Sequence, residues 1–162
     1  MTGLVAAADD QDPEEGAVAA DGWFPDIALA TIRNSVRLVD GAVTTDRLTG
    51  AIEGAMLTAF RALAPWRAAQ ILAGAATFDQ VTALELNGRN RAEALWERII
   101  RHFAAAELAD LNRDLTATDE GLDRADEASE SADEHRRLAY AALADMQSIG
   151  GGLVPRNRVS LV

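Results

Sequence analysis

The segment between residues 90 and 111 constrains the fold more than any other part of the chain. Written at 3.6 residues per turn, its large apolar side chains fall on one arc, whereas Glu97, Arg98 and Arg101 fall on the opposite face. The apolar arc comprises Ala92, Leu95, Trp96, Ile99, Ile100, Phe103 and Ala106. This period is held for about six turns of ~3.6 residues and predicts an amphipathic helix. Because few residues of the chain are aromatic and this segment holds two, we expect it to be the central core helix.

Composition and charge narrow the class of protein. The chain has 162 residues, of which 49% are hydrophobic, and this suffices for one domain with a real core. The formal net charge is −11, and the 15 basic residues are all arginines. A strongly acidic chain lacks the basic surface that tight binding to a nucleic-acid backbone requires. The absence of Cys excludes disulfides, a thiolate nucleophile and thiolate metal sites.

No part of the sequence indicates a membrane partner. No apolar run approaches the ~18 residues that a spanning helix needs. Residues 4–8 are apolar, but they lack a basic flank and run into Asp9 and Asp10, so we expect no signal peptide. The sequence therefore predicts a soluble protein.

The N-terminal part is expected to be an acidic tail followed by a docking tether. Residues 1–22 are small and acidic and are predicted to be disordered. Trp23 and Phe24 stand outside any helix pattern, so we expect them to dock on the body. Pro25 suits a helix start, and a first helix is predicted over residues 26–38, followed by a turn at 40–41.

A second helix is predicted after an N-cap at residues 44–46. Its core face comprises Leu48, Ile52, Ala55, Ala59 and Leu63. Leu57 and Phe60 lie off that face, so the helix is either sandwiched inside the fold or engaged in a subunit contact. Pro65 then predicts either a new helix or a bent extension that ends near Gly74.

The remaining segments complete an all-α bundle of about four to five helices. Residues 77–86 are ambiguous, with a short helix as one reading, and residues 87–88 form a turn. A polar loop is expected over 112–121, and a last helix over 122–148. The apolar seam of that helix, spaced as in coiled coils, comprises Ala128, Ala132, His135, Ala139, Ala142, Met146 and Ile149. The predicted organisation is a tail (1–22), a helical domain (23–149), and a glycine hinge with an extended docking tail (150–162) that carries Val159 and Leu161.

The sequence offers little for catalysis or metal binding. Asp110, Asn112 and Asp114 match the start of a calcium loop, but Leu115 and Gly121 stand where that loop needs Gly and Glu. We therefore expect a solvated loop without calcium there. The chain's two histidines, His102 and His135, are expected to be packed or half-exposed, because no second ligand follows either at helical spacing. We predict no catalytic residue, metal or cofactor, and no enzyme activity.

Several segments, in one order along the chain, resemble the head completion proteins of P2-like tailed phages, the L-protein family. The matching segments are 24–27 (FPDI), 41–48 (GAVTTDRL), 66–70 (WRAAQ), 95–98 (LWER), 117–121 (ATDEG) and 158–162 (RVSLV). The resemblance runs from Trp23 to the C-terminus. Each motif alone is weak evidence for the resemblance, which rests on the motifs occurring in the same order along the chain.

The resemblance implies a structural role in the virion rather than an enzyme. Such proteins form a ring beneath the portal after DNA packaging, retain DNA, and present a surface for tail attachment. The implied partners are further copies of the chain, the portal protein, and a tail or neck completion protein, with DNA only as passing cargo. The implied location is the head–tail neck of the virion, and the host cytoplasm during assembly.

Two sets of residues are predicted to serve this role. Candidate interface residues are Trp23, Phe24, Leu57, Phe60, Val159 and Leu161. Candidate channel-facing acids, which would repel DNA and ease its passage, are Asp123, Asp126, Glu127 and Glu130. A merely solvated acidic face remains an alternative for the second set. Two other functions remain open: a soluble acidic helical adaptor or regulator without a virion role, and an all-helical enzyme whose site the sequence does not reveal.

Overall fold

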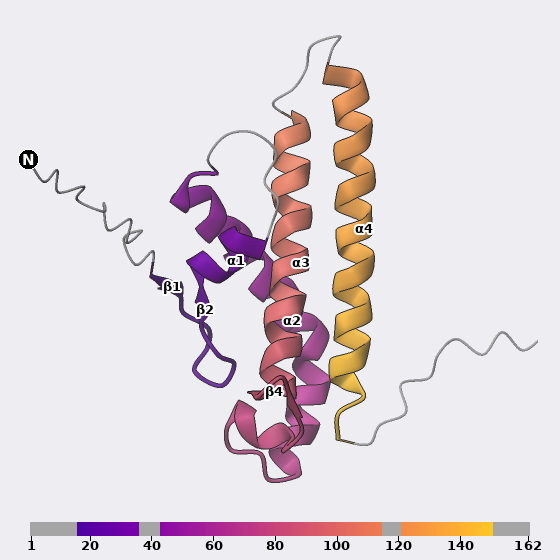
Figure 1. Ribbon diagram of the computed structural model, residues 1–162. Coiled ribbons are helices and arrows are strands. Elements are labelled where there is room, and N and C mark those ends of the chain that lie inside the picture. Colours follow the sequence, from indigo (N-terminus) through magenta and orange to yellow (C-terminus); the bar gives the residue numbers. More distant parts are fainter. Residues whose placement is uncertain (1–15, 36–42, 115–120, 151–162) are drawn as a thin grey trace, which may run out of the picture.

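The structure, a computed structural model, describes residues 16–35, 43–114 and 121–150, with the backbone alone for 112–114 and 121–130. Within these ranges it has four α-helices: α1 (Leu29–Ser35), α2 (Thr45–Leu72), α3 (Arg91–Asp114) and α4 (Gly121–Gln147). The smaller elements are the strands β1 (Ala17–Val18), β2 (Ile27–Ala28), β3 (Glu85–Leu86) and β4 (Arg89–Asn90), and the 3-10 helix η1 (Phe78–Val81). Figure 1 shows α3 and α4 side by side along the length of the molecule, with α2 behind them and α1 on one flank. The predicted all-α class is confirmed.

The central helix is α3, as the sequence predicted. Its arc is buried at Ala92, Trp96, Ile99, Ile100, Phe103 and Ala106, and Leu95 is half-buried. The helix continues to Asp114, so the loop expected from residue 112 is wrong over 112–114. Asp110 and Asp114 therefore belong to a helix, where they cannot form the turn of a calcium loop.

Helix α4 lies against α3 through small side chains. Ala132, Ala139, Ala142 and Met146 are almost fully buried, and Ile149 is 9% exposed, as the seam predicted. The side chain of Ala128 lies outside the described residues. Alanine at these positions lets the two helix backbones approach closely, since it adds little side-chain volume between them.

Helix α2 is one continuous helix, capped by Thr44, whose hydroxyl oxygen accepts a hydrogen bond from the Arg47 main-chain N–H at 3.4 Å. The five residues of its predicted core face are all buried. The helix runs through Pro65, so the alternative of a separate new helix is wrong. Pro65 lies on the exposed side, where the carbonyl that loses its helical N–H partner, that of Arg61, can bond to water.

The N-terminal boundary differs from the prediction. Residues 16–22 are ordered: β1 pairs antiparallel with β2, with Ala17 opposite Ala28 and Val18 opposite Ile27. Val18 is buried, which gives this ribbon an apolar contact with the core. Ile27 joins a strand rather than a helix, and α1 begins only at Leu29. Residues 1–15, the predicted turn at 40–41 and the end of the predicted first helix lie outside the described residues.

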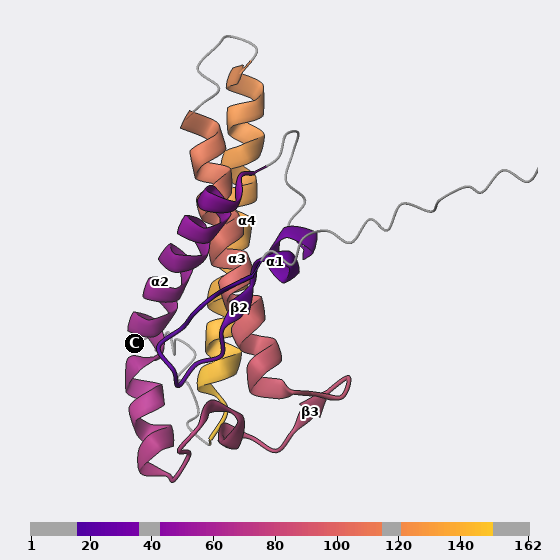
Figure 2. The same ribbon diagram turned by 90° about the vertical axis from the view of Figure 1, so that its left-hand side faces the viewer.

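Between α2 and α3 the chain forms η1 and a hairpin. Phe78 of η1 is buried, whereas β3 and β4 project from the body (Figure 2). The predicted turn at Asn87 and Gly88 is confirmed, with φ of 53° and 71°. Two successive left-handed residues in a two-residue loop make the type I′ turn that Asn-Gly favours.

Candidate functional site

An aromatic cluster fastens the N-terminal segment to the helices. Its members are Trp23, Phe24, Phe60, Trp66, Phe78 and Trp96. The Phe24 ring stacks on Trp96 with ring centroids 4.4 Å apart, and Phe60 stacks on Trp96 at 5.7 Å. The Trp96 indole Nε1 also donates a hydrogen bond to the Pro25 carbonyl, 2.9 Å away. The predicted docking of the aromatic tether is thus confirmed.

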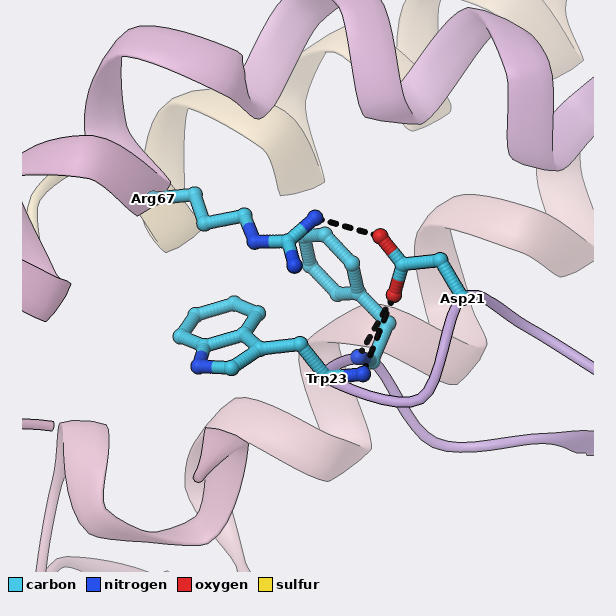
Figure 3. Close-up of polar contacts among 4 residues, drawn as sticks. Asp21, Trp23 and Arg67 are labelled. Atoms are coloured by element: carbon cyan, nitrogen blue, oxygen red, sulfur yellow. Dashed lines mark hydrogen bonds and ion pairs between the residues drawn. The ribbon is translucent and has the colours of Figure 1, made fainter. Parts of the chain in front are cut away.

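Asp21 holds the same segment through polar contacts (Figure 3). One carboxylate oxygen accepts hydrogen bonds from the main-chain N–H groups of Trp23 and Phe24, both at 3.1 Å, and the other pairs with Arg67 of α2. The Arg67 guanidinium lies 5.0 Å from the Trp23 ring centroid and 5.5 Å from that of Phe24. Burial favours a higher pKa for Asp21, but these hydrogen bonds and Arg67 outweigh it and leave its pKa lowered.

The predicted interface residues differ in their exposure to solvent. Trp23 and Phe24 are buried within the protein's own core, which leaves almost no side-chain surface for another subunit. Phe60 is half-buried against Phe24 and Trp96, so it too contributes chiefly to the core. Leu57 is 65% exposed and remains available. Val159, Leu161 and the side chains of Asp123, Asp126, Glu127 and Glu130 lie outside the described residues.

Among the described residues, five of the seven exposed large apolar side chains fall into two groups, and Leu111 and Tyr140 lie outside both. The α2 outer stripe comprises Leu57, Ala64, Ala68, Ile71 and Leu72, which are all exposed and lie near one side of the helix, at i, i+7, i+11, i+14 and i+15. The second group is the hairpin leucines, Leu84 and Leu86, which are two residues apart and therefore share one face of the ribbon. Leu72 is 89% exposed, and Leu84 and Leu86 are 60% and 63% exposed. Within each group, large apolar side chains are exposed close to one another, and the two groups mark candidate assembly surfaces.

Sequence reasoning identified Leu57 but missed the hairpin leucines and Asp21. The signal for the hairpin was present, because Asn-Gly between short alternating segments is the strongest short-range indication of a two-residue hairpin. The role of Asp21 depends on Arg67, 46 residues away, and no local pattern reveals such a pairing.

The two histidines meet between α3 and α4. His102 Nδ1 lies 3.1 Å from His135 Nδ1, and both side chains are half-buried. Burial, with smaller contributions from Arg101, His135 and Arg98, lowers the pKa of His102 to about 4. Burial also lowers the pKa of His135, against the opposing effect of Glu134. At neutral pH both rings are therefore uncharged, and one Nδ1–H can donate to the other.

Within the described ranges, no group of three or more metal-ligating side chains comes together. Asp110 instead pairs with Arg136 of α4. None of the described helices is long and apolar enough to cross a membrane.

Comparison with known proteins identifies the family. Searches of curated proteins and of solved structures returned no match. The family model described as phage head completion protein (GPL) matches residues 18–155, which include Val18 of β1, the aromatic cluster, the hairpin and all four helices. The match covers most of the chain and agrees with the resemblance seen in the sequence. This chain belongs to the phage head completion protein (GPL) family.

Proposed function

We propose that this protein forms a ring of identical subunits beneath the portal after DNA packaging, retains the packaged DNA, and offers a surface for a tail or neck completion protein. Membership of the head completion family supports a structural role in the virion. The ring, the portal contact, the retention of DNA and assembly in the host cytoplasm are the parts of the proposal that go beyond family membership. In this proposal the protein has no catalytic activity.

The observation that carries the proposal is the apolar surface left over after the core is complete. Trp23, Phe24 and Trp96 close the core of the single chain, yet Leu57 and Leu72 of α2 remain exposed. A subunit that works alone gains nothing from large exposed apolar side chains, whereas a subunit of an assembly buries them against neighbours.

The chain's charge suits a channel through which DNA passes without being held. The formal net charge is −11, and acids crowd the first half of α4, whose backbone is helical from Gly121. In the proposed ring, Asp123, Asp126, Glu127 and Glu130 face the channel and repel the DNA backbone. Replacing the four by Asn or Gln should alter DNA retention or ejection. Unchanged packaging and infectivity in that variant would exclude the channel-facing arrangement.

The direct test is co-purification with the portal protein encoded in the same genome, followed by particle mass. The proposal expects a complex whose mass corresponds to a full ring on the portal. If a properly assembled portal binds none of this protein, and the chain stays a monomer or dimer, the soluble acidic adaptor becomes the better description.

A further inference from the structure

We propose that the β3–β4 hairpin of one copy packs against the C-terminal part of the α2 outer stripe of the next copy, in a head-to-tail contact. The inference rests on the proposed ring and identifies the surfaces that close it. The occupant of each surface is a second copy of this chain. Three features of the described residues support this pairing.

The first feature is placement. Figure 2 shows the hairpin on one side of the molecule and α2 on the opposite side, and both reach the same end of the helix bundle. The two surfaces therefore cannot meet within one chain. When the hairpin of one copy binds the stripe of the next, the first copy keeps a free stripe and the second keeps a free hairpin. Further copies can therefore add in the same way until the ring closes. Because the hairpin and the C-terminal half of α2 both lie toward the same end of the bundle, copies related by rotation about an axis along the bundle can bring them together.

The second feature is complementary shape and polarity. The hairpin offers Leu84 and Leu86 as two projecting side chains on one face. The stripe offers small residues, Ala64 and Ala68, followed by Ile71, which is 47% exposed. Projecting leucines fit over alanines because the small side chains leave room between the larger ones.

The third feature is complementary charge. Arg91 adjoins the hairpin through its main-chain N–H, which donates to the Leu84 carbonyl at 2.8 Å. Its side chain is exposed and has no ion-pair partner among the described residues. The C-terminal turn of α2 carries no basic residue, so the negative end of that helix dipole lacks a compensating charge. Arg91 of one copy can supply this charge to α2 of its neighbour.

Cysteine cross-linking tests the contact, because the chain has no Cys of its own. The double variant Ala68→Cys with Leu86→Cys, oxidised at high concentration and again with the portal, should give a ladder of covalent oligomers. Each single variant should give at most dimers, and an equimolar mixture of the two should give mixed dimers. The matched control pairs Leu86→Cys with Tyr140→Cys, since Tyr140 on α4 is 59% exposed and outside the contact.

A charge reversal gives an independent readout. Arg91→Glu should reduce the cross-linked fraction of the double variant several-fold. The change cannot act by weakening α3, because Arg91 is the first residue of that helix and an acid favours a helix N-terminus. Arg98→Glu, at an exposed position of α3 seven residues beyond Arg91, is the control and should leave cross-linking unchanged.

The outcomes separate this inference from the proposed function. Portal-bound protein of ring mass that gives no 68–86 cross-link would overturn the contact and leave the function standing. A 68–86 ladder without portal binding would support the contact and remove the portal role. If the 140–86 pair cross-links as well as the 68–86 pair, the contact is non-specific and the inference is wrong.

Discussion

The indole Nε1 of Trp66 donates a hydrogen bond to the main-chain oxygen of Ile149, 3.0 Å away, and so joins α2 to the end of α4. Gln70 donates to the same oxygen, also at 3.0 Å. Trp23 is buried to nearly the same degree, at 9% exposed against 8% for Trp66, but its Nε1 has no hydrogen-bond partner among the described residues. The two tryptophans thus form a pair of similar burial in which only Trp66 makes a hydrogen bond with its indole N–H.

Trp66→Phe should therefore destabilise the protein more than Trp23→Phe. Both changes remove the same atoms from similarly buried sites, but only the first removes a hydrogen bond, whose net worth is about 1 kcal/mol. Urea unfolding with unchanged m-values measures the difference. Equal losses for the two variants would show that the bond to Ile149 adds no stability.

Gly150→Ala should cost more stability than Gly74→Ala. Both glycines have left-handed backbones, with φ of 93° and 105°, where a side chain costs about 1–2 kcal/mol. A Cβ at Gly74 meets open space, whereas one at Gly150 overlaps the side-chain amide of Gln70 and displaces its bond to Ile149. Thermal or urea unfolding of the two variants provides the comparison. A Gly74 variant as unstable as the Gly150 variant would mean that backbone strain alone accounts for both losses.

Stability should fall as the pH is lowered from about 6.5 towards 4. The folded-state pKa values of His102 and His135 lie below the ordinary value of 6.5, so in this window the unfolded chain binds protons that the folded chain does not. The stability is therefore fully present above the unfolded-state pKa and is lost as the pH falls. The charged groups around the pair are Arg98, Arg101 and Glu134.

The double variant His102→Gln with His135→Gln should show a flatter dependence of stability on pH over that window. Unfolding in urea at several pH values between 7.5 and 4.5 measures it. Glu107 has a pKa raised by burial and by Asp110, so it acts in the opposite sense, but it is common to both proteins. An unaltered slope in the variant would assign the pH dependence to groups other than the histidines.

Asp21→Ala should loosen the N-terminal segment more than Asp21→Asn. The Asn variant keeps an acceptor for the main-chain N–H groups of Trp23 and Phe24 and loses only the charge opposite Arg67, a partly exposed pair worth about 0–1 kcal/mol. The Ala variant loses all three contacts. Limited proteolysis within residues 16–28 reports the difference, because local opening exposes that segment while the helices stay folded.

Much of the helical body could be predicted because the patterns in it are local. The arc around Trp96 and the seam through Ala139 and Met146 follow from the 3.6-residue period, and the cap at Thr44 follows from side-chain chemistry. The Asn87–Gly88 turn could also be predicted from the sequence, because it needs only two residues that tolerate positive φ.

The remainder depended on contacts between distant segments. The sequence predicted residues 16–22 to be disordered, yet β1 pairs with β2 and Val18 is buried in the core. From the sequence, Trp23 and Phe24 could be interpreted either as a docking tether or as interface residues. The burial of their rings distinguishes these two roles. Pro65 left open a new helix or a bent extension, and its position on the exposed side, where a lost main-chain bond can be replaced by water, lets α2 continue through it.

The bond between Trp96 and Pro25 spans 71 residues and sets an order for folding during synthesis. The ribosome releases the β1–β2 ribbon before α2 and α3, and Trp96, whose indole bonds to Pro25, is made after Phe60, Trp66 and Phe78. At ~5–20 residues per second, the segment stays without its anchor for roughly 4 to 14 seconds. The β1–β2 ribbon is therefore made early and buried late, and the Trp23 and Phe24 rings beside it lack their complete set of packing partners until α3 has emerged.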